Sequence, residues 1–532
     1  MMTNQAILRI FLIFVVKFFT GCGTNEILLD CDVSETHTTK NSCSFTTTTC
    51  IIEEFRDVWQ NQNVKLSFTN AREENFTSLV FQNSFVSTLP KEIFDQFPHL
   101  ESLDMSNTGL TQIRGRTFVN ATDLVELNLM RNQLTDITTQ TFVGATNLRA
   151  LHLAHNRIVT IWSNAFRDAK QLEFIDLGHN VIQLIHKETF SMLDNLRNIY
   201  LYHNKIIDVN PLSFVHNKKL NTIDLTGNHM REVELDLSTP RLNKLDLSDC
   251  FLDELVLRKS TEATENITIR YLNLRKNTFT NISNIRIDRK EVQLQTVDLS
   301  ENKLHALNIP PDFVQDITLF KLMKNDLWEI SPGFMTSMKK LKSLYLDKNA
   351  FRLYENMFKP VPDLKILSIS GNHLKFFDFS WFDGLSNLTQ LNLEDNRLRQ
   401  INYTQISNTL PSLQSFYLDK NEFKCAFVEQ MVNYVRNTTD GKNIEFSSNG
   451  RGLFPTCVPD DEPSNFRWEW MVVGIFVTAF VVVVAIFRRQ LIEKIDDVRR
   501  RFRSYSNMRE TENGVSGGGG TRLRDDGDDQ IL

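Results

Sequence analysis

The chain repeats a short pattern in which leucine or isoleucine alternates with polar residues and the run ends on a polar residue, most often asparagine. The segment LVELNLMRNQL at residues 124–134 returns as LRALHLAHNRI, LEFIDLGHNVI, LRNIYLYHNKI and LNTIDLTGNHM. A period of two places apolar residues on one face of a strand and polar residues on the other. We therefore expect one short strand per repeat and, when the repeats stack, one continuous parallel sheet.

The polar residue that closes each run marks the repeat, and its positions give 15 repeats between Phe76 and Phe423. We expect this side chain to be buried where the strand ends and to satisfy backbone groups of adjacent turns, as a ladder. Cys250 is expected there as a buried ladder residue without a partner. The ladder positions are Ser84, Thr108, Asn132, Asn156, Asn180, Asn204, Asn228, Cys250, Asn277, Asn302, Asn325, Asn349, Asn372, Asn396 and Asn421.

A phenylalanine recurs every 24 residues in the outer half of the repeats. These rings are expected to fill the wide convex side as a spine. The spine lapses between Phe214 and Phe313, where the repeat spacing is also irregular, so we hypothesise a change of curvature or a hinge there. The regular positions are Phe94, Phe118, Phe142, Phe166, Phe190 and Phe214.

The pattern LxxLxLxxNxL followed by phenylalanine resembles the extracellular leucine-rich-repeat family over roughly two thirds of the chain. The resemblance implies an α/β repeat fold over residues 76–424. The fold would be a curved solenoid with a parallel concave β-sheet and a Phe spine. To this fold we add terminal disulfide caps and one transmembrane helix, which other segments of the chain predict. The resemblance says almost nothing about the ligand.

Residues 425–458 are expected to close the solenoid as a C-terminal cap, because open ends expose the core. Phe427, Met431 and Val435 recur at helical spacing and predict a helix over the last strand. We predict a disulfide between Cys425 and Cys457. The cap resembles a reduced form of the family's C-terminal flanking cap, without its four-cysteine framework.

Residues 23–75 are expected to form an N-terminal cap that contains Cys31, Cys43 and Cys50. If Cys22 leaves with a signal peptide, one of these thiols is free. If Cys22 is retained, two bridges form. The sequence does not decide the pairing.

Two apolar segments predict the membrane topology. Residues 1–22 have the features of a secretory signal peptide, with an uncleaved anchor as the alternative. Residues 470–487 carry no charge and are long enough to cross a bilayer, although a buried soluble helix is the alternative. Arginines follow directly, which places the N-terminal side outside the cell. We expect a single-pass type I plasma-membrane protein with a stalk at 459–469 and a largely disordered cytoplasmic tail at 488–532, too short for a signalling domain.

Glycosylation sequons avoid the exposed positions of the expected strands, which leaves the concave face free for a partner. They begin at Asn75, Asn120, Asn266, Asn281, Asn387, Asn402 and Asn437.

Candidate ligand-binding residues therefore come from the solvent-facing positions of the concave strands. Exposed aromatic residues favour a protein partner, and an acidic zone further along would attract a basic surface. His155, His179 and His203 form a row that would sense pH or hold a metal. The plainer interpretation is that histidine is simply a common residue before the asparagine in such repeats. The candidates are His152, His155, Phe174, Asp176, His179, Tyr200, Tyr202, His203, Asp224 and Asp246, and the acidic zone adds Asp249, Asp298 and Glu301.

The sequence carries no catalytic motif, so we expect no enzyme, no cofactor and no metal. The dispersed Lys and Arg, with a net charge of −6, argue against a nucleic-acid partner.

The combination of features resembles the transmembrane leucine-rich immune proteins of mosquitoes, with Toll ectodomains, chaoptin and connectin as wider relatives. The resemblance implies a receptor or co-receptor for protein or microbial ligands, possible homo- or heterodimers, and a role in innate immunity. The alternative is a homophilic adhesion or structural surface protein.

Overall fold

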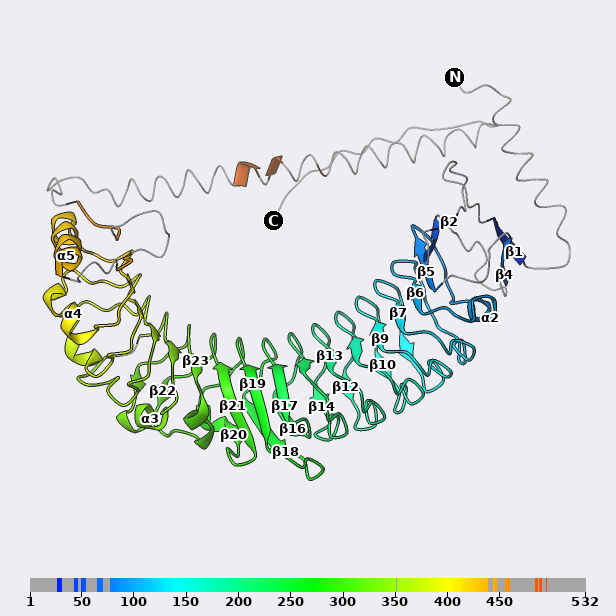
Figure 1. Ribbon diagram of the computed structural model, residues 1–532, viewed down its shortest axis with the longest axis horizontal. Coiled ribbons are helices and arrows are strands. Elements are labelled where there is room, and N and C mark those ends of the chain that lie inside the picture. The colour runs from blue at the N-terminus through cyan, green and yellow to red at the C-terminus, as the bar shows by residue number, and fades with distance from the viewer. Residues whose placement is uncertain are drawn as a thin grey trace, which may run out of the picture. The chain divides into compact units, whose positions relative to one another are not determined.

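The computed structural model describes residues 26–30, 43–45, 49–53, 65–69, 77–350, 352–438, 444–446, 455–459, 484–486, 488–489 and 494. The chain divides into two units, Met1–Val458 and Pro459–Leu532. The first unit holds the repeats. It is an arc of stacked turns with its long sheet on the inner side (Figure 1).

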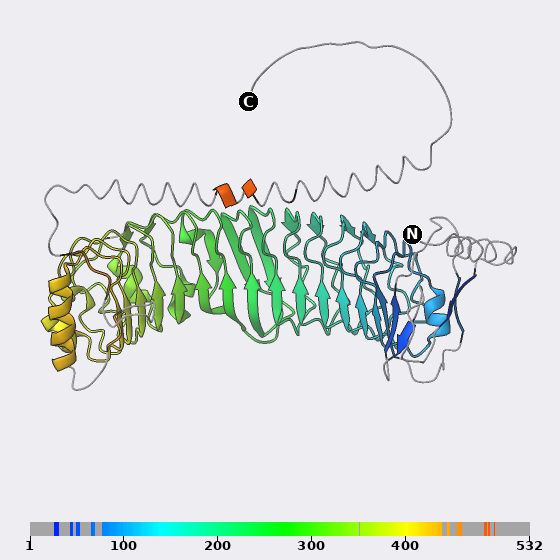
Figure 2. The same ribbon diagram turned by 90° about the horizontal axis from the view of Figure 1, so that it is seen from above.

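The concave sheet is open and contains 17 strands among the described residues, because β2 and β28 at its ends each pair with one strand. All neighbours are parallel except β2 and β3, and Figure 2 shows the strands side by side. The strands are β2 (Cys43–Phe45), β3 (Thr49–Glu53), β5 (Ser78–Gln82), β6 (Ser102–Asp104), β7 (Glu126–Asn128), β9 (Ala150–His152), β11 (Phe174–Asp176), β13 (Asn198–Tyr200), β15 (Thr222–Asp224), β17 (Arg241–Asp246), β19 (Ile267–Asn273), β21 (Val292–Asp298), β23 (Leu319–Lys321), β25 (Ser343–Tyr345), β26 (Ile366–Ser368), β27 (Gln390–Asn392) and β28 (Ser415–Tyr417).

Each of the 15 predicted repeats contributes one strand from β5 to β28. The sheet itself begins earlier than the repeat count predicted. Strand β3 pairs in parallel with β5 and so belongs to the sheet, although it lies in the expected N-terminal cap. The other two strands near this end, β1 (Glu26–Asp30) and β4 (Lys65–Thr69), pair with each other.

The predicted ladder is confirmed, and all 15 of its side chains are buried. Asn180 shows the arrangement: its amide donates to the carbonyls of Leu153 and Leu177, both at 3.0 Å, and its oxygen accepts the N–H of Ile158 at 3.0 Å. Cys250 is a buried free cysteine whose thiol donates to the carbonyl of Leu225 at 3.2 Å. Apart from Thr108, whose hydroxyl bonds to Met105 of its own turn and to Asn132 of the next, each ladder side chain bonds to its own turn and the preceding one.

The phenylalanine spine is also confirmed. The six rings from Phe94 to Phe214 are buried, and successive ring centroids lie 5.3–5.9 Å apart. The repeated rings fill the convex side as the periodicity predicted. Their stacking distance exceeds the spacing of strands in a sheet, about 4.8 Å, and this difference curves the solenoid toward the sheet.

The lapse in the spine does not produce a hinge. Between Phe214 and Phe313 a parallel three-stranded sheet occupies the convex side, formed by β16 (Glu232–Leu237), β18 (Glu254–Lys259) and β20 (Ile285–Ile287). The concave strands β17, β19 and β21 lengthen to six or seven residues in the same stretch. The hinge hypothesis was wrong because backbone hydrogen bonds replace the missing rings. Because hydrogen-bonded strands set a similar distance between successive repeats on the concave and convex faces, this segment should be straighter than the rest of the solenoid.

The remaining convex elements are short. They are β8 (Asp136–Ile137), β10 (Thr160–Ile161), β12 (Leu184–Ile185), β14 (Asp208–Val209), β22 (Ala306–Leu307), β24 (Glu329–Ile330), the helices α2 (Glu92–Gln96), α3 (Pro332–Ser337) and α4 (Ile406–Thr409), and the 3-10 helices η1 (Ile282–Asn284), η2 (Asp312–Asp316), η3 (Phe379–Phe382) and η4 (Tyr403–Gln405).

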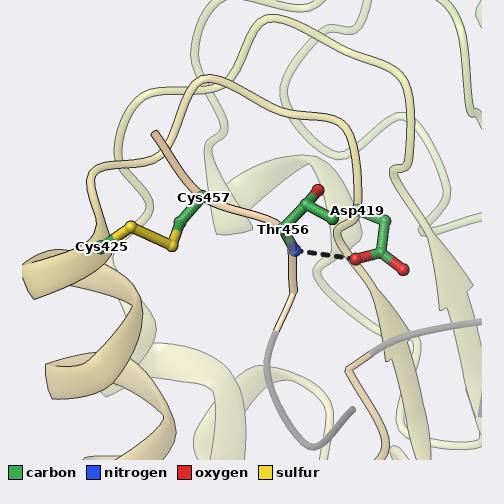
Figure 3. Close-up of a disulfide and its surroundings, with 4 residues drawn as sticks. All are labelled: Asp419, Cys425, Thr456 and Cys457. Atoms are coloured by element: carbon green, nitrogen blue, oxygen red, sulfur yellow. Dashed lines mark hydrogen bonds between the residues drawn. A yellow bond between two sulfur atoms is a disulfide. The ribbon is translucent and has the colours of Figure 1, made fainter. Parts of the chain in front are cut away.

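The predicted C-terminal cap is present. Helix α5 (Cys425–Thr438) buries Met431 and Val435, while Phe427 is only partly buried. The predicted disulfide joins Cys425 to Cys457, with their Cα atoms 5.0 Å apart (Figure 3). Beside it the N–H of Thr456 donates to Asp419 at 2.8 Å. The returning segment is thereby fixed to the end of the last repeat.

Within the described residues no helix has the length and apolar character needed to cross a bilayer. Only residues 484–486 of the expected membrane helix at 470–487 are described, and they are helical. The expected signal peptide, the side chains of Cys31, Cys43 and Cys50, most of the stalk and most of the tail lie outside the described residues.

We expect Asn180→Ala to lower the free energy of unfolding by about 3 kcal/mol, because it leaves buried backbone groups of two turns without hydrogen-bond partners. Urea denaturation of the full-length chain measures the loss. The matched control is Asn147→Ala, since Asn147 is exposed and its amide makes one bond, to the carbonyl of Thr122 at 2.7 Å. Equal effects of the two changes would contradict the ladder's structural role.

Candidate functional site

An aromatic patch lies on the concave face over β9, β11, β13 and the turns that follow β13. We define it as His152, Phe174, Tyr200 and Tyr202, all half-buried. The ring of Phe174 is 4.9 Å from that of His152 and 5.4 Å from that of Tyr200. Tyr200 and Tyr202 meet edge to face at 6.3 Å. The structure therefore brings the predicted aromatic residues of three successive repeats together.

Strand pairing fixes this arrangement. Asp176 is in register with His152 on one side and Tyr200 on the other, and Tyr200 is in register with Asp224. The positions four residues before each ladder residue thus form one row across the sheet. The described row runs Val80, Asp104, Asn128, His152, Asp176, Tyr200, Asp224, Asp246, Asn273, Asp298, Lys321, Tyr345, Ser368, Asn392 and Tyr417.

Aspartate and asparagine have a structural duty in this row. Their side-chain oxygen accepts the backbone N–H two residues later, as in Asp176 with Gly178 at 2.9 Å and Asn128 with Met130 at 3.1 Å. Such a bond satisfies an N–H where the strand ends. An acidic residue here is therefore first a strand terminator, and its charge is available for binding only if nothing neutralises it.

The predicted acidic zone is neutralised, so the expectation of a basic partner docking there was wrong. Asp224 and Asp246 are buried, and Lys244 lies between them with its Nζ 3.0 Å from each carboxylate. Lys321 lies 3.4 Å from Asp298, which is also buried. Glu301 binds Arg275 and Lys324 at 2.8 and 2.6 Å, and Asp249 lies 3.9 Å from Lys276.

The pKa values follow this pairing. Burial alone would raise the pKa of Asp246, but hydrogen bonds from Ser248, Asn273 and Lys244 outweigh it and lower the pKa. Burial raises the pKa of Tyr271 to about 12, and Asp298 and Asp246 raise it as well. Lys321 lies 5.9 Å from the centre of the Tyr271 ring. We had not selected Lys244, Tyr271 or Lys321, although strand alternation placed them on the same face as the aspartates.

Tyr202 is positioned by a glycine of the preceding repeat. A Cβ atom on Gly178 would lie 2.3 Å from the Tyr202 ring, so the ring packs directly on the glycine backbone. Burial raises the pKa of Tyr202, and the nearby charges of Asp176 and Asp224 raise it further. The phenol therefore stays protonated at neutral pH.

The histidine row borders the patch. The rings of His155 and His179 stack at 4.2 Å, and those of His179 and His203 at 4.7 Å. All three residues have positive φ, as do the residues before every other ladder position, where Asn, Asp, Lys, Arg, Glu and Gly occur. Histidine tolerates this left-handed conformation better than most residues. Backbone geometry thus explains part of the row, in line with the plainer interpretation.

The middle histidine of the row, His179, is harder to protonate than a free histidine. Burial lowers the pKa of His179, and the neighbouring His155 and His203 lower it further, while Asp176 acts in the opposite direction. No group of three metal-binding side chains is present among the described residues.

Six of the predicted sequon asparagines are exposed, and none of them lies within a strand of the concave sheet. The seventh, Asn75, lies outside the described residues. Between Asn120 and Asn266 the sequence contains no sequon, and this interval includes the whole patch.

The leucine-rich-repeat family model matches residues 74–134, 122–182, 176–230, 316–374 and 362–423. The chain is a leucine-rich-repeat protein. The matches omit the stretch in which the convex sheet replaces the spine. The family is one of binding proteins and is typically non-enzymatic, in agreement with the lack of a catalytic motif.

Curated relatives match short parts of the chain. Podocan of Mus musculus is 29% identical over 138 residues, which cover 25% of this chain and 21% of podocan. Leucine-rich repeats and immunoglobulin-like domains protein 3 of Homo sapiens is 32% identical over 133 residues, which cover 25% of this chain and 12% of that protein. The chain therefore spans less than a quarter of the length of these two relatives.

Solved structures share the fold over more of the chain. The mosquito LRIM1/APL1C complex has a TM-score of 0.55 at 17% identity, covering 87% of this chain and 77% of that chain. The Drosophila Toll–Spatzle complex has a TM-score of 0.54 at 17% identity, covering 80% of this chain and 64% of that chain.

We expect protonation of His179 to weaken the fold as the pH falls. The folded chain holds the pKa of His179 below the 6.5 of free histidine, so below 6.5 the unfolded chain binds the proton more readily. Wild-type protein should therefore lose more stability than His179→Gln between about pH 7.5 and about pH 5.5. Urea denaturation at both pH values measures this, and equal losses in the two proteins would refute it.

Proposed function

We propose that the chain is a recognition protein that binds a protein partner through the aromatic patch of its concave face. The observation that carries the proposal is the contiguous set of half-exposed rings on β9, β11 and β13. Tyrosine and other large rings contribute most of the binding energy in many protein interfaces. The patch also lies in the interval without sequons, so glycans would not cover it.

Two solved structures of this fold support a protein partner by analogy. The structure of LRIM1 is that of its complex with APL1C, and the structure of Toll is that of its complex with Spatzle. Identities of 17% make this an analogy of scaffold, and the ligands of those proteins are not carried over.

The proposal includes a location and a role. The uncharged segment at 470–487 and the arginines after it support a single-pass protein of the plasma membrane with the repeats outside the cell. The Toll–Spatzle complex is described as a hub in development and innate immunity, which makes an immune receptor or co-receptor our preferred role. Homophilic adhesion is the competing role: protein-coated beads that clump without a second protein would favour it.

A glycan placed on the patch tests the proposal on living cells. The double change Tyr200→Asn with Tyr202→Thr creates a sequon across Leu201 in the middle of the patch. We expect proximity crosslinking and mass spectrometry to recover protein partners with the wild-type full-length chain and to lose them with this variant, because the glycan and the loss of two rings block the surface.

The matched control carries an added glycan elsewhere. Arg149→Thr creates a sequon at the exposed Asn147, in the turn before β9. This variant should keep the partners. Recovery of the same partners by the patch variant, at equal surface expression, would show that the concave patch is not the binding surface.

A further inference from the structure

Asp176, like Asp104, differs from Asp224, Asp246 and Asp298 because no cation pairs with it among the described residues. Asp224 and Asp246 share Lys244, and Asp298 faces Lys321. Among the described residues Asp176 forms no ion pair. Its bonds come from two neutral donors, the Gly178 N–H and the Tyr202 phenol.

The arginines that directly precede the two neighbouring strands, β9 and β13, are already engaged. Arg149 and Arg197 both form ion pairs with Glu173, the residue before β11, at 3.9 and 3.1 Å. Two histidines lie near Asp176: His152, in register on β9, is 3.5 Å from Glu126, and burial and the neighbouring histidines lower the pKa of His179. The negative charge of Asp176 is therefore left facing the concave side.

Aromatic rings border this charge. Phe174 lies two residues earlier on the same face, Tyr200 lies in register on the neighbouring strand, and Tyr202 packs over Gly178. The Tyr202 ring is nearly perpendicular to that of Tyr200, at 80°. Ring faces at different angles beside one carboxylate suit a cation, which is attracted by the ring faces and donates hydrogen bonds to the oxygens.

We propose that Asp176, Tyr200 and Tyr202 form a site for the guanidinium group of an arginine side chain on the protein partner. Arginine fits better than lysine because its planar group stacks on a ring while its N–H groups bind the carboxylate. This proposal rests on the proposed function and specifies which chemical group of the partner the patch recognises.

The decisive variant should fold. In Asp176→Asn the side-chain oxygen still accepts the Gly178 N–H, as Asn128, Asn273 and Asn392 do at this position in other repeats. The matched control is Asp104→Asn. Asp104 has the same duty toward Ser106, at 2.8 Å, but has no aromatic neighbour on the adjacent strands at this row position.

Tyr202 provides an independent variant. Tyr202→Phe keeps the ring, whereas Gly178→Ala keeps the tyrosine and forces its ring away, since the new Cβ would overlap it. Gly178 does not have positive φ, so alanine adds no backbone strain there.

The test is fluorescence anisotropy of a dye-labelled Gly-Ser peptide that contains arginine, added to the full-length chain. The same peptide with citrulline, which has the shape of arginine without its charge, is the probe control. We expect the arginine peptide to bind roughly tenfold more tightly than the citrulline peptide. Asp176→Asn should abolish that preference, and Gly178→Ala should weaken it several-fold, roughly as loss of one cation–ring contact. Asp104→Asn and Tyr202→Phe should largely keep it.

Three results would overturn the site: no arginine preference in the wild-type chain at about 1 mM peptide, a preference unaffected by Asp176→Asn, or equal losses in Asp176→Asn and Asp104→Asn. The glycan experiment separates this failure from that of the proposed function. If the patch glycan removes the cellular partners while Asp176→Asn leaves peptide binding intact, the patch binds proteins without an arginine site. If the glycan has no effect but Asp176→Asn loses the preference, the arginine site exists outside the proposed function.

Discussion

Every turn of this solenoid depends on satisfying the backbone groups where its strand ends. The buried ladder residue does so for two turns at once, as Asn180 does for its own repeat and the one before it. Leaving such groups without partners in the core would be costly, so the ladder position accepts few residue types. Its geometry also sets the residue before it in the left-handed conformation in all 15 repeats. The histidine row is thus placed by the same constraint that holds the core.

On the concave face a second set of side-chain hydrogen bonds satisfies backbone N–H groups. The residues that make these bonds determine which charges are available to a partner. Aspartate or asparagine four residues before the ladder position caps the end of the strand. The cap uses one carboxylate oxygen and does not remove the negative charge of the aspartate. That charge is then either paired with a cation from a neighbouring position or left unpaired. Lys244 and Lys321 supply cations on one side of the face. Around Asp176 the neighbouring positions are aromatic instead.

Periodicity was sufficient to predict the strands, the ladder from Ser84 to Asn421, the spine from Phe94 to Phe214 and the capping helix, because each depends on residues repeated at a fixed distance. It was insufficient where the repeat breaks. The convex strands β16, β18 and β20 arise from residues outside the regular spacing, and the absence of phenylalanine had suggested a change of curvature or a hinge. The sequence of one segment does not reveal which other strand it will pair with.

The same limit applied to the site. The aromatic residues and the histidine row were found by reading equivalent positions of successive repeats, and the structure brings them into contact. The acidic zone was misjudged because aspartates were considered one repeat at a time, without Lys244 on the adjacent strand. Reading the sheet by rows would have shown both the aspartates paired with a lysine and the two of the described row without a cation, Asp104 and Asp176.

Hydroxyl-radical footprinting of the full-length chain, with and without a partner recovered from cells, tests the central claim most directly because the side chains concerned are among the most reactive. Binding at the patch predicts reduced oxidation of Phe174, Tyr200 and Tyr202. Trp162 and Trp328, exposed by 54% and 53% outside the concave strands, should be unchanged. Protection of the two tryptophans with full oxidation of the patch would contradict recognition by the concave face.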